Sequence, residues 1–261
     1  MASKTQRKPQ HEAAQAPKRK SVVAATSNAV PLDFDKPHTL VDVVIFTLKN
    51  DALHVLLVRR PDGKGEPFPG LWALPGGYVN TAIDADLLAC AQRKLFEKTG
   101  LHSPYLEQLG SWGSATRDPR GWSATHAYFA LVPDQMPLLP PLDVAWFAAD
   151  DLLPTARLAF DHETILHAAM ERLRSKVEYT SLPAFLLPEP FTLPQLQRCY
   201  EAVLGRPVDK SGFRTRMLAA DFLDEVGVIE SESNRPPVGY RLKDRSAPVV
   251  FPRTFSPRGV G

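Results

Sequence analysis

The chain has 261 residues, 44% of them hydrophobic, and a formal net charge of +2, a composition typical of a soluble protein with one large domain or two small ones. It contains no apolar run near the roughly 20 residues of a membrane-spanning helix, and its N-terminus lacks the apolar core of a signal peptide. Its two cysteines, Cys90 and Cys199, lie far apart in the sequence. These features exclude a membrane protein and a disulfide scaffold, and they predict reduced packing cysteines in a cytoplasmic protein.

The first 36 residues form a segment of low hydrophobicity and positive charge. Before residue 33 the only acidic residue is Glu12, whereas the basic residues are Lys4, Arg7, Lys8, Lys18, Arg19 and Lys20. This composition predicts a disordered basic tail over residues 1–36. The tail is either a solvated leader or a basic arm that attracts nucleic acid, and both interpretations remain open.

The region from residue 37 to 180 contains several short apolar runs. Runs over residues 38–48 and 52–58 predict two strands joined as a hairpin. A further strand is expected to begin at residue 71 and to break at Gly76-Gly77. Later runs predict strands over residues 105–111, 122–132 and 144–148. Two helical patterns alternate with these strands. The alternation predicts an α+β fold class, with a sandwich as the first domain.

The first of the two expected helices covers about residues 82–98 and ends at Gly100, which suits a C-terminal cap. The second begins near Asp161, whose side chain is favoured at an N-cap. The predicted buried faces follow three- and four-residue spacing: Leu87, Leu88, Ala91, Leu95 and Phe96 in the first helix, and Ile165, Ala169, Leu173 and Val177 in the second.

A second domain is expected over residues 183–247, after a break marked by prolines. Thr192 and Gln195 form a capping-box pattern that predicts a short helix closed by Gly205. A longer helix is expected from the cap Asp209 to about Val226, closed by Gly227, and residues 228–229 and 240–242 can pair as a small ribbon. Two helices followed by a ribbon predict a winged helix-turn-helix, and residues 248–261 are expected to be a flexible tail.

Charges in the second domain are sorted by sign along the chain. Basic residues begin the longer helix (Lys210, Arg214 and Arg216) and lie on or after the wing (Arg235, Arg241 and Lys243), whereas acidic residues gather between these two groups. The first group is placed where a recognition helix meets base edges, and the second suits phosphates. The sorting favours double-stranded DNA as a partner; the alternative is a small solvated helical domain.

The most informative stretch runs from Leu74 to Leu101. A loop containing Gly76 and Gly77 leads into a helix, an arrangement that lets backbone amides approach phosphate oxygens. Together with the sequence RKLFEKTGL it resembles the Nudix box, whose pattern is G-x5-E-x7-R-E-U-x-E-E-x-G-U with U aliphatic. The match covers Gly77, Arg93, Leu95, Glu97, Gly100 and Leu101, with a gap after Gly77 that is two residues longer than the standard one.

The resemblance implies that glutamates of the box hold Mg²⁺ on one face of the helix, but this chain departs from the pattern. The three other glutamate positions are Ala85, Lys94 and Lys98, so only Glu97 remains, and Asp84 and Asp86 are expected to point elsewhere. One carboxylate cannot hold a catalytic Mg²⁺, and two lysines repel it. We therefore expect no catalytic residues beyond the remnants Arg93 and Glu97, no cofactor, and Mg²⁺ only if hydrolase activity remains.

Lys94 and Lys98 lie four residues apart and so share a helical face. One hypothesis is that they neutralise the pyrophosphate of a ligand directly, without metal and without hydrolysis. The alternative is a solvated helix face on which Arg93 and Glu97 form an ordinary i,i+4 pair.

Further candidate ligand residues follow in the loop at residues 114–122 and at the start of the second helix. Arg117 and Arg120 flank Asp118 and can clamp phosphate or carboxylate, or they belong to a surface turn. Trp112 and Trp122 are expected in the core more than against a base. His162 is either a ligand group or a capping residue.

The chain resembles the Nudix-related transcriptional regulators of NAD metabolism, the NrtR family, over roughly residues 40–245. The likeness rests on LWALPGGYV, RKLFEKTG, SATRDPRGWSATHAYFALV, FDHETI and FTLPQLQRCYEAVLGRPVDKSGFR. It implies a homodimeric repressor whose Nudix-like domain senses ADP-ribose or a related nucleotide and thereby releases operator DNA. Two alternatives are an active ADP-ribose pyrophosphatase with an accessory winged helix, and a nucleic-acid-binding protein whose Nudix-like part is only a dimerisation scaffold.

Overall fold

The computed structural model describes residues 36–103, 105–134, 143–152, 157–229 and 236–255. The predicted basic tail lies outside these residues except for Lys36, and so does Arg235. Within the described residues, no helix is both long and apolar enough to span a bilayer.

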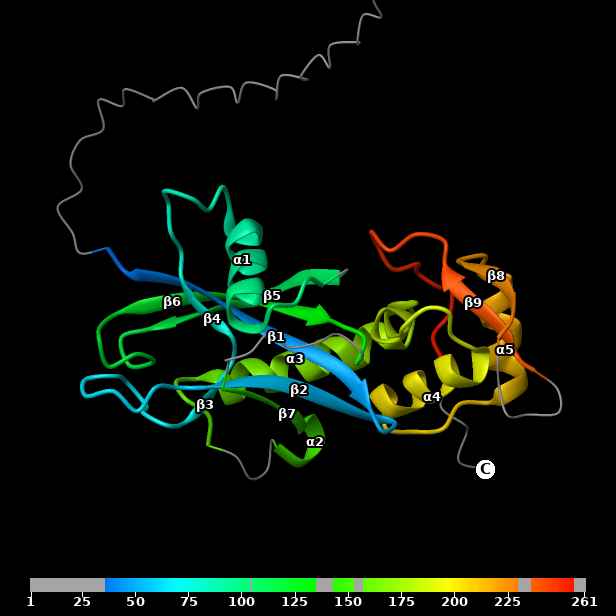
Figure 1. Cartoon of the computed structure of the whole chain (residues 1–261), viewed down its shortest axis with the longest axis horizontal. Coiled ribbons are helices and arrows are strands. Elements are labelled where there is room, and N and C mark those ends of the chain that lie inside the picture. Colours follow the sequence, from blue (N-terminus) through cyan, green and yellow to red (C-terminus); the bar gives the residue numbers. More distant parts are fainter. Residues whose placement is uncertain (1–35, 104, 135–142, 153–156, 230–235, 256–261) are drawn as a thin grey trace, which may run out of the picture. The chain divides into compact units, whose positions relative to one another are not determined.

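A mixed sheet forms the centre of the region from residue 37 to 180 (Figure 1). Its strands are β1 (His38–Lys49), β2 (Ala52–Arg59), β3 (Trp72–Ala73), β4 (Gly76–Tyr78), β5 (Tyr105–Ser114), β6 (Ser123–Leu131) and β7 (Val144–Ala148). The order is β3-β2-β1-β6-β5, with β4 also paired to β1 and β7 to β2. Only β1 and β6 are parallel among these pairs; the predicted hairpin of β1 and β2 is confirmed.

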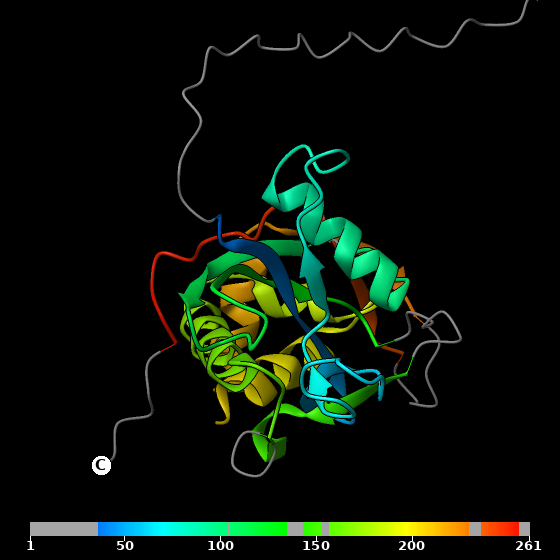
Figure 2. The same ribbon diagram turned by 90° about the vertical axis from the view of Figure 1, so that its left-hand side faces the viewer.

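The sheet has a core on each face because successive side chains of β1 point to opposite sides. Val41, Val43 and Ile45 pack on one side with Cys90, Ala91 and Leu95 of α1 (Leu87–Thr99). Val44 and Phe46 pack on the other side with Ile165, Ala169 and Leu173 of α3 (His162–Val177). Figure 2 shows α1 lying across the sheet, and the short helix α2 (Ala149–Leu152) follows β7. This architecture confirms the predicted α/β/α sandwich.

Helix α1 begins later than the expected start at residue 82. Asp86 is its N-cap and accepts a hydrogen bond from the Ala89 N–H at 2.7 Å, so the residues just before it form turns. Leu88 and Phe96 were expected in the buried face but are 42% and 43% exposed. Cys90, which was not expected in the buried face of this helix, is fully buried and packs in the core with Ala91 and Leu95.

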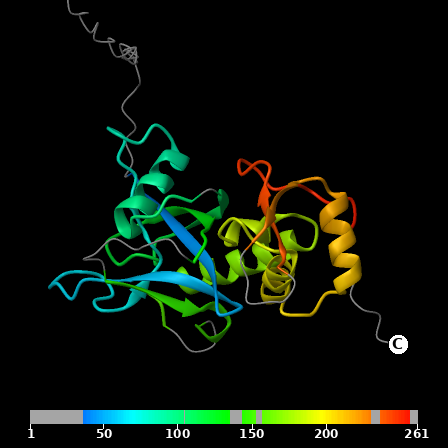
Figure 3. The ribbon, with the colours of Figure 1, turned by 45° about the vertical axis from the view of Figure 1, so that its right-hand side comes forward.

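The winged helix domain contains the 3-10 helix η1 (Leu182–Leu186), α4 (Leu193–Leu204), α5 (Lys210–Ala219), β8 (Leu223–Val228) and β9 (Val238–Leu242) (Figure 3). The capping box of α4 is confirmed: the Gln195 N–H donates to Thr192 Oγ1 at 3.2 Å, and the Thr192 N–H donates to Gln195 Oε1 at 2.7 Å. Gly205 caps the C-terminus of α4 in the left-handed conformation, as expected.

The predicted extension of the second helix of this domain to Val226 is wrong. Helix α5 ends at Ala219, and Asp221 turns the chain with a φ of 51°. The following residues pair with β9 in an antiparallel ribbon that is longer than expected. Gly227 therefore does not close a helix; it lies at the irregularity in this ribbon with a φ of 91°, which favours glycine.

Residues 249–255 are not the loose segment that was expected. The Phe251 N–H donates to the Tyr179 carbonyl at 2.7 Å, and the Phe255 N–H donates to the Glu178 carbonyl at 3.1 Å. Phe251 is buried, and Phe255 contacts the ring of Tyr200 at 5.2 Å between centroids. Two aromatic residues in a Pro- and Arg-bearing sequence thus anchor this segment; residues 256–261 lie outside the described residues.

Helix α3 connects the two domains. Its N-terminal end lies in the Nudix-like domain, where Ile165 joins the core of the sheet. At its other end, Arg174 Nε donates to the Val203 carbonyl at 3.2 Å, and Arg206 pairs with Glu178 at 2.6 Å. The core on this face of the sheet continues into the second domain through Val177, Phe185 and Tyr200.

Candidate functional site

A pocket of about 400 Å³ opens between the sheet, α1 and the N-terminal end of α3. All eight residues predicted to bind a ligand line it: Gly76, Gly77, Lys94, Lys98, Arg117, Asp118, Arg120 and His162. Sequence reasoning missed other lining residues, among them Asp42, Arg59, Arg60, Tyr78, Asp143 and Phe160. One signal for Asp42 was available, because it is a lone charge within the apolar run LVDVVIF.

Strand β4 brings the two glycines against β1 and α1. A Cβ on Gly76 would lie 2.1 Å from Asp42 Oδ1 and 2.5 Å from the Val41 carbonyl oxygen, so no side chain fits there. Gly77 has a φ of 149°, and a Cβ on it would lie 3.3 Å from Lys94 Nζ. The missing side chains allow the ammonium group of Lys94 to approach the backbone of β4.

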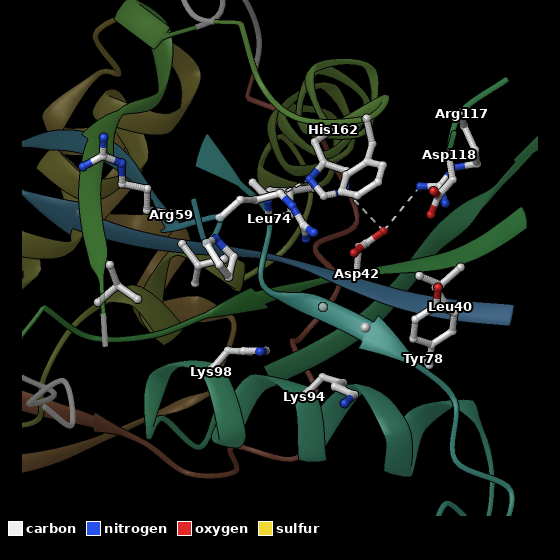
Figure 4. Close-up of a pocket in the computed structure, with 18 of the residues that line it drawn as sticks. Leu40, Asp42, Arg59, Leu74, Tyr78, Lys94, Lys98, Arg117, Asp118 and His162 are labelled. Atoms are coloured by element: carbon white, nitrogen blue, oxygen red, sulfur yellow. Dashed lines mark hydrogen bonds and ion pairs between the residues drawn. The ribbon is translucent and has the colours of Figure 1, made fainter. Parts of the chain in front are cut away.

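The face of α1 that turns toward β4 carries Lys94 and Lys98 (Figure 4). The carboxylate of Glu97 is already engaged, because it accepts hydrogen bonds from Arg93 at 2.9 Å and from Lys94 at 3.1 Å. The hydrogen bond from Arg93 is the main cause that lowers the pKa of Glu97, against the opposing effect of burial. The expected Arg93–Glu97 pair is present.

Asp84 was expected to lie on the helix and to point elsewhere than the metal-ligand position of the Nudix box; it precedes the helix, does not line the pocket, and binds Arg93 instead. Its carboxylate accepts two hydrogen bonds from Arg93, at 2.6 Å from Nε and 2.5 Å from Nη2, and its side chain is 2% exposed. These hydrogen bonds hold the pKa of Asp84 well below its usual range. Because residues before Asp86 form turns and not a helix, Asp84 can fold back onto Arg93.

The residues at the Nudix box positions do not fit Mg²⁺, the ion that the resemblance implies. Glu97 is the only acidic residue of α1, and both of its oxygens are paired with cations. Lys94 and Lys98 occupy positions where the box has carboxylates. Among the described residues, no group of three or more His, Cys, Asp or Glu side chains is arranged to hold a metal ion. A hard cation needs several oxygen ligands, and these positions offer ammonium groups instead.

A buried polar network forms the floor of the pocket beside α3. Arg117 donates to both oxygens of Asp161, at 2.8 and 2.9 Å, and lies 3.6 Å from Asp42. Asp161 precedes α3 as expected, but its side chain binds Arg117 and caps no backbone N–H. His162 Nε2 lies 3.5 Å from Asp42 Oδ2 (Figure 4). The network thus joins β1, the 114–122 loop and α3.

The contacts of His162 indicate which of its ring nitrogens carries a proton. The Leu74 N–H donates to Nδ1 at 2.8 Å, so Nδ1 carries no proton and Nε2–H faces Asp42. Burial alone would raise the pKa of Asp42, but His162 and the charge of Arg117 together lower it. Asp42 is therefore ionised in the folded protein at neutral pH.

Arg117 and Arg120, expected either to clamp a ligand or to belong to a surface turn, both line the pocket, and the guanidinium group of each is paired with a carboxylate. Arg120 donates to both oxygens of Asp118, at 3.0 Å from Nε and 2.7 Å from Nη2, and the Asp118 side chain is fully buried. Each arginine is thus held by its own carboxylate. Trp112 packs against the core, whereas Trp122 is 50% exposed and was wrongly expected in the core.

Of the residues predicted to bind DNA, those early in α5 are exposed, whereas those at the ribbon are in ion pairs. Lys210 and Arg214 are exposed on α5, close to its N-terminal end. On the ribbon, Arg241 pairs with Asp224 at 3.3 Å and Lys243 pairs with Asp221 at 2.5 Å.

Arg216, which was also predicted to bind DNA, has its guanidinium group occupied by contacts within the protein. Its guanidinium group lies 4.1 Å from the ring centroid of Phe255 and donates to the carbonyl oxygens of Arg253 and Thr254, the latter at 2.8 Å. It therefore anchors the C-terminal segment, because the two carbonyls and the aromatic ring together occupy its charged end.

Both domains match known protein families. Residues 37–169 match the NUDIX domain, and residues 183–242 match the NrtR DNA-binding winged helix domain. The chain is 41% identical to the "ADPR responsive transcriptional repressor NtrR" of Acinetobacter baylyi, over 85% of this chain and 88% of that protein.

Two solved structures of Shewanella oneidensis NrtR are also similar. The complex with a 27mer DNA has a TM-score of 0.76 and 41% identity, covering 84% of this chain and 99% of that one. The Nudix domain in complex with ADP ribose has a TM-score of 0.50 and 42% identity, covering 56% and 94%. The chain therefore belongs to the NrtR family, with a Nudix domain followed by an NrtR winged helix domain.

Proposed function

We propose that this protein is a transcriptional repressor of NAD metabolism genes that binds double-stranded operator DNA and releases it when ADP-ribose or a related nucleotide occupies the Nudix pocket. The observation that carries the proposal is the combination, in one chain, of a cation-lined Nudix pocket and an NrtR winged helix. The relatives support it, since one is an ADPR-responsive repressor and others were solved with DNA and with ADP ribose.

The effector is held and left intact in this proposal. Hydrolysis of a pyrophosphate in Nudix enzymes relies on a metal that activates water, and the positions of Lys94 and Lys98 supply positive charge in place of metal ligands. Glu97 is paired with Arg93 and Lys94, so it does not serve as a free general base. A sensor of this kind reports the concentration of the nucleotide without consuming it.

The DNA-binding surface is formed by the start of α5 and the ribbon. Lys210 and Arg214 are exposed at the end of α5 that a recognition helix directs toward base edges. Arg241 and Lys243 exchange their carboxylate partners for phosphates of the backbone. A homodimer would place two such surfaces on a two-fold symmetric operator.

The test is a fluorescence-anisotropy titration of the full chain against DNA from its own upstream region, at fixed salt, with and without ADP-ribose. We expect tight binding without the nucleotide, weaker binding with it, and no release by AMP at the same concentration. Chromatography of the same samples after incubation with Mg²⁺ should show intact ADP-ribose. Unchanged DNA affinity in the presence of ADP-ribose would overturn the proposal, and AMP production at ordinary enzyme rates would overturn the non-hydrolytic part.

A further inference from the structure

The positive charge of the pocket is unevenly neutralised. Its cationic lining residues are Arg59, Arg60, Lys94, Lys98, Arg117 and Arg120. Four of them have carboxylate partners: Arg60 with Glu66, Lys94 with Glu97, Arg117 with Asp161, and Arg120 with Asp118. Arg59 and Lys98 make no ion pair with any residue that the structure describes. Figure 4 shows Arg59 apart from Lys98, and its Nε donates to the Gly70 carbonyl at 3.2 Å, so an anionic ligand group on the α1 side of the pocket is attracted first to Lys98.

Lys94 belongs to the same region, although it is paired. It lies one helical turn from Lys98 on the face of α1 that turns toward β4 (Figure 4). Its partner Glu97 is 43% exposed and is also bound by Arg93, so Lys94 can exchange this partner for a phosphate while Glu97 keeps its second cation. In contrast, the carboxylates that bind Arg117 and Arg120 are largely or fully buried and hold them at short distances.

We infer that Lys98 and Lys94 form a metal-free site for the pyrophosphate group of the effector, with the ammonium groups in the place of the divalent cation of Nudix enzymes. The inference rests on the proposed function and adds to it the mode of binding. A pyrophosphate diester carries one negative charge on each phosphate, and the two ammonium groups neutralise these two charges without Mg²⁺. The same cations repel a divalent ion from this face of α1.

Calorimetric titration of the full chain with ADP-ribose, in excess EDTA and separately in millimolar Mg²⁺, tests the inference. The expected result is the same affinity in both buffers. Affinity that appears only in Mg²⁺ would overturn the metal-free site and leave the proposed repressor function standing. Absence of binding in both buffers would overturn the proposed function itself, and this inference with it, so the two failures are distinguishable.

A matched pair of variants separates a local contact from general electrostatics. Lys98→Met and Gln92→Glu each lower the net charge by one, but Gln92 is exposed on α1 and does not line the pocket. Loss of a charge-assisted contact should weaken ADP-ribose binding about 10- to 100-fold in Lys98→Met. Gln92→Glu should bind like the wild type. Equal affinity in the two variants would remove Lys98 from the site.

The double variant Lys94→Glu/Lys98→Glu restores the carboxylates of the Nudix pattern beside Glu97. Its affinity for ADP-ribose should fall strongly in EDTA and recover in Mg²⁺, because the phosphate then needs a metal bridge. Circular dichroism and thermal melting establish that the variant is folded. A folded double variant that binds equally well in EDTA would refute the assignment, since the two lysines would then be dispensable.

Discussion

The buried arginine at the floor of the pocket provides the sharpest test of the fold around the site. Arg117→Met removes the guanidinium group that binds Asp161, whose side chain is 24% exposed, and that lies 3.6 Å from the buried carboxylate of Asp42. Removal of one member of a buried ion pair costs about 3–5 kcal/mol, because an uncompensated charge stays behind. For a chain of this size, that loss lowers the Tm by about 6 to 20 °C.

The decrease in Tm caused by Arg117→Met should become smaller as the pH is lowered. The pKa of Asp42 is lowered in the folded protein, so its ionised form contributes stability above the unfolded pKa of about 3.9, and this contribution disappears as pH falls through the folded pKa. Without Arg117 the folded pKa rises, and protonation then relieves part of the penalty. The difference in Tm between wild type and variant should be largest near neutral pH and should narrow below about pH 4.

Thermal denaturation followed by circular dichroism across this pH range measures the effect. Arg241→Met is the control, because Arg241 and Asp224 form an exposed pair, and such a pair contributes about 0–1 kcal/mol. A change in Tm for Arg117→Met that is no larger than that of the control would refute the reasoning. A large change that is the same at every pH would show that packing, and not charge, is what Arg117 supplies.

Further substitutions test the glycine strand, the DNA-binding helix and the helix caps. Gly76→Ala places a methyl group 2.1 Å from a carboxylate oxygen of Asp42, so β4 should separate from β1, with loss of ADP-ribose binding in calorimetry. Arg214→Ala should weaken DNA binding by about 1–3 kcal/mol in anisotropy titrations if it contacts a base. Arg216→Ala should instead lower the Tm, because Arg216 anchors the C-terminal segment; a loss of DNA affinity without a change in Tm would contradict this role. Thr192→Ala removes the capping box of α4 and should cost about 1 kcal/mol in urea denaturation.

The sandwich and the first winged-helix element could be predicted because their signals are local. Alternation of apolar residues in β1 and the reciprocal capping pattern of Thr192 and Gln195 depend on neighbours a few residues away. The end of α5 could not be predicted in this way. Residues 223–226 also fit a helical spacing, and they form the start of β8 because β9 supplies hydrogen bonds from later in the chain.

The members of the pocket could be identified individually, but their pairings could not. Arg117 finds its carboxylate 44 residues later, at Asp161, and the backbone N–H of Leu74 reaches His162 across 88 residues. Such contacts depend on the sheet that brings the segments together. For that reason the sequence leaves open whether Arg117 and Arg120 clamp a ligand or belong to a surface turn, and the structure shows each of them paired with a carboxylate.

Helix α3 gives the pocket and the winged helix a rigid part in common. Its 16 residues span about 24 Å. At the pocket end lie His162 and the N-cap residue Asp161; at the other end Arg174 donates to Val203 of α4, and the C-cap residue Glu178 pairs with Arg206 after α4. One continuous helix thus carries residues of the pocket floor at one end and contacts of the winged helix domain at the other. The pocket floor and the packing of α4 therefore depend on the same structural support.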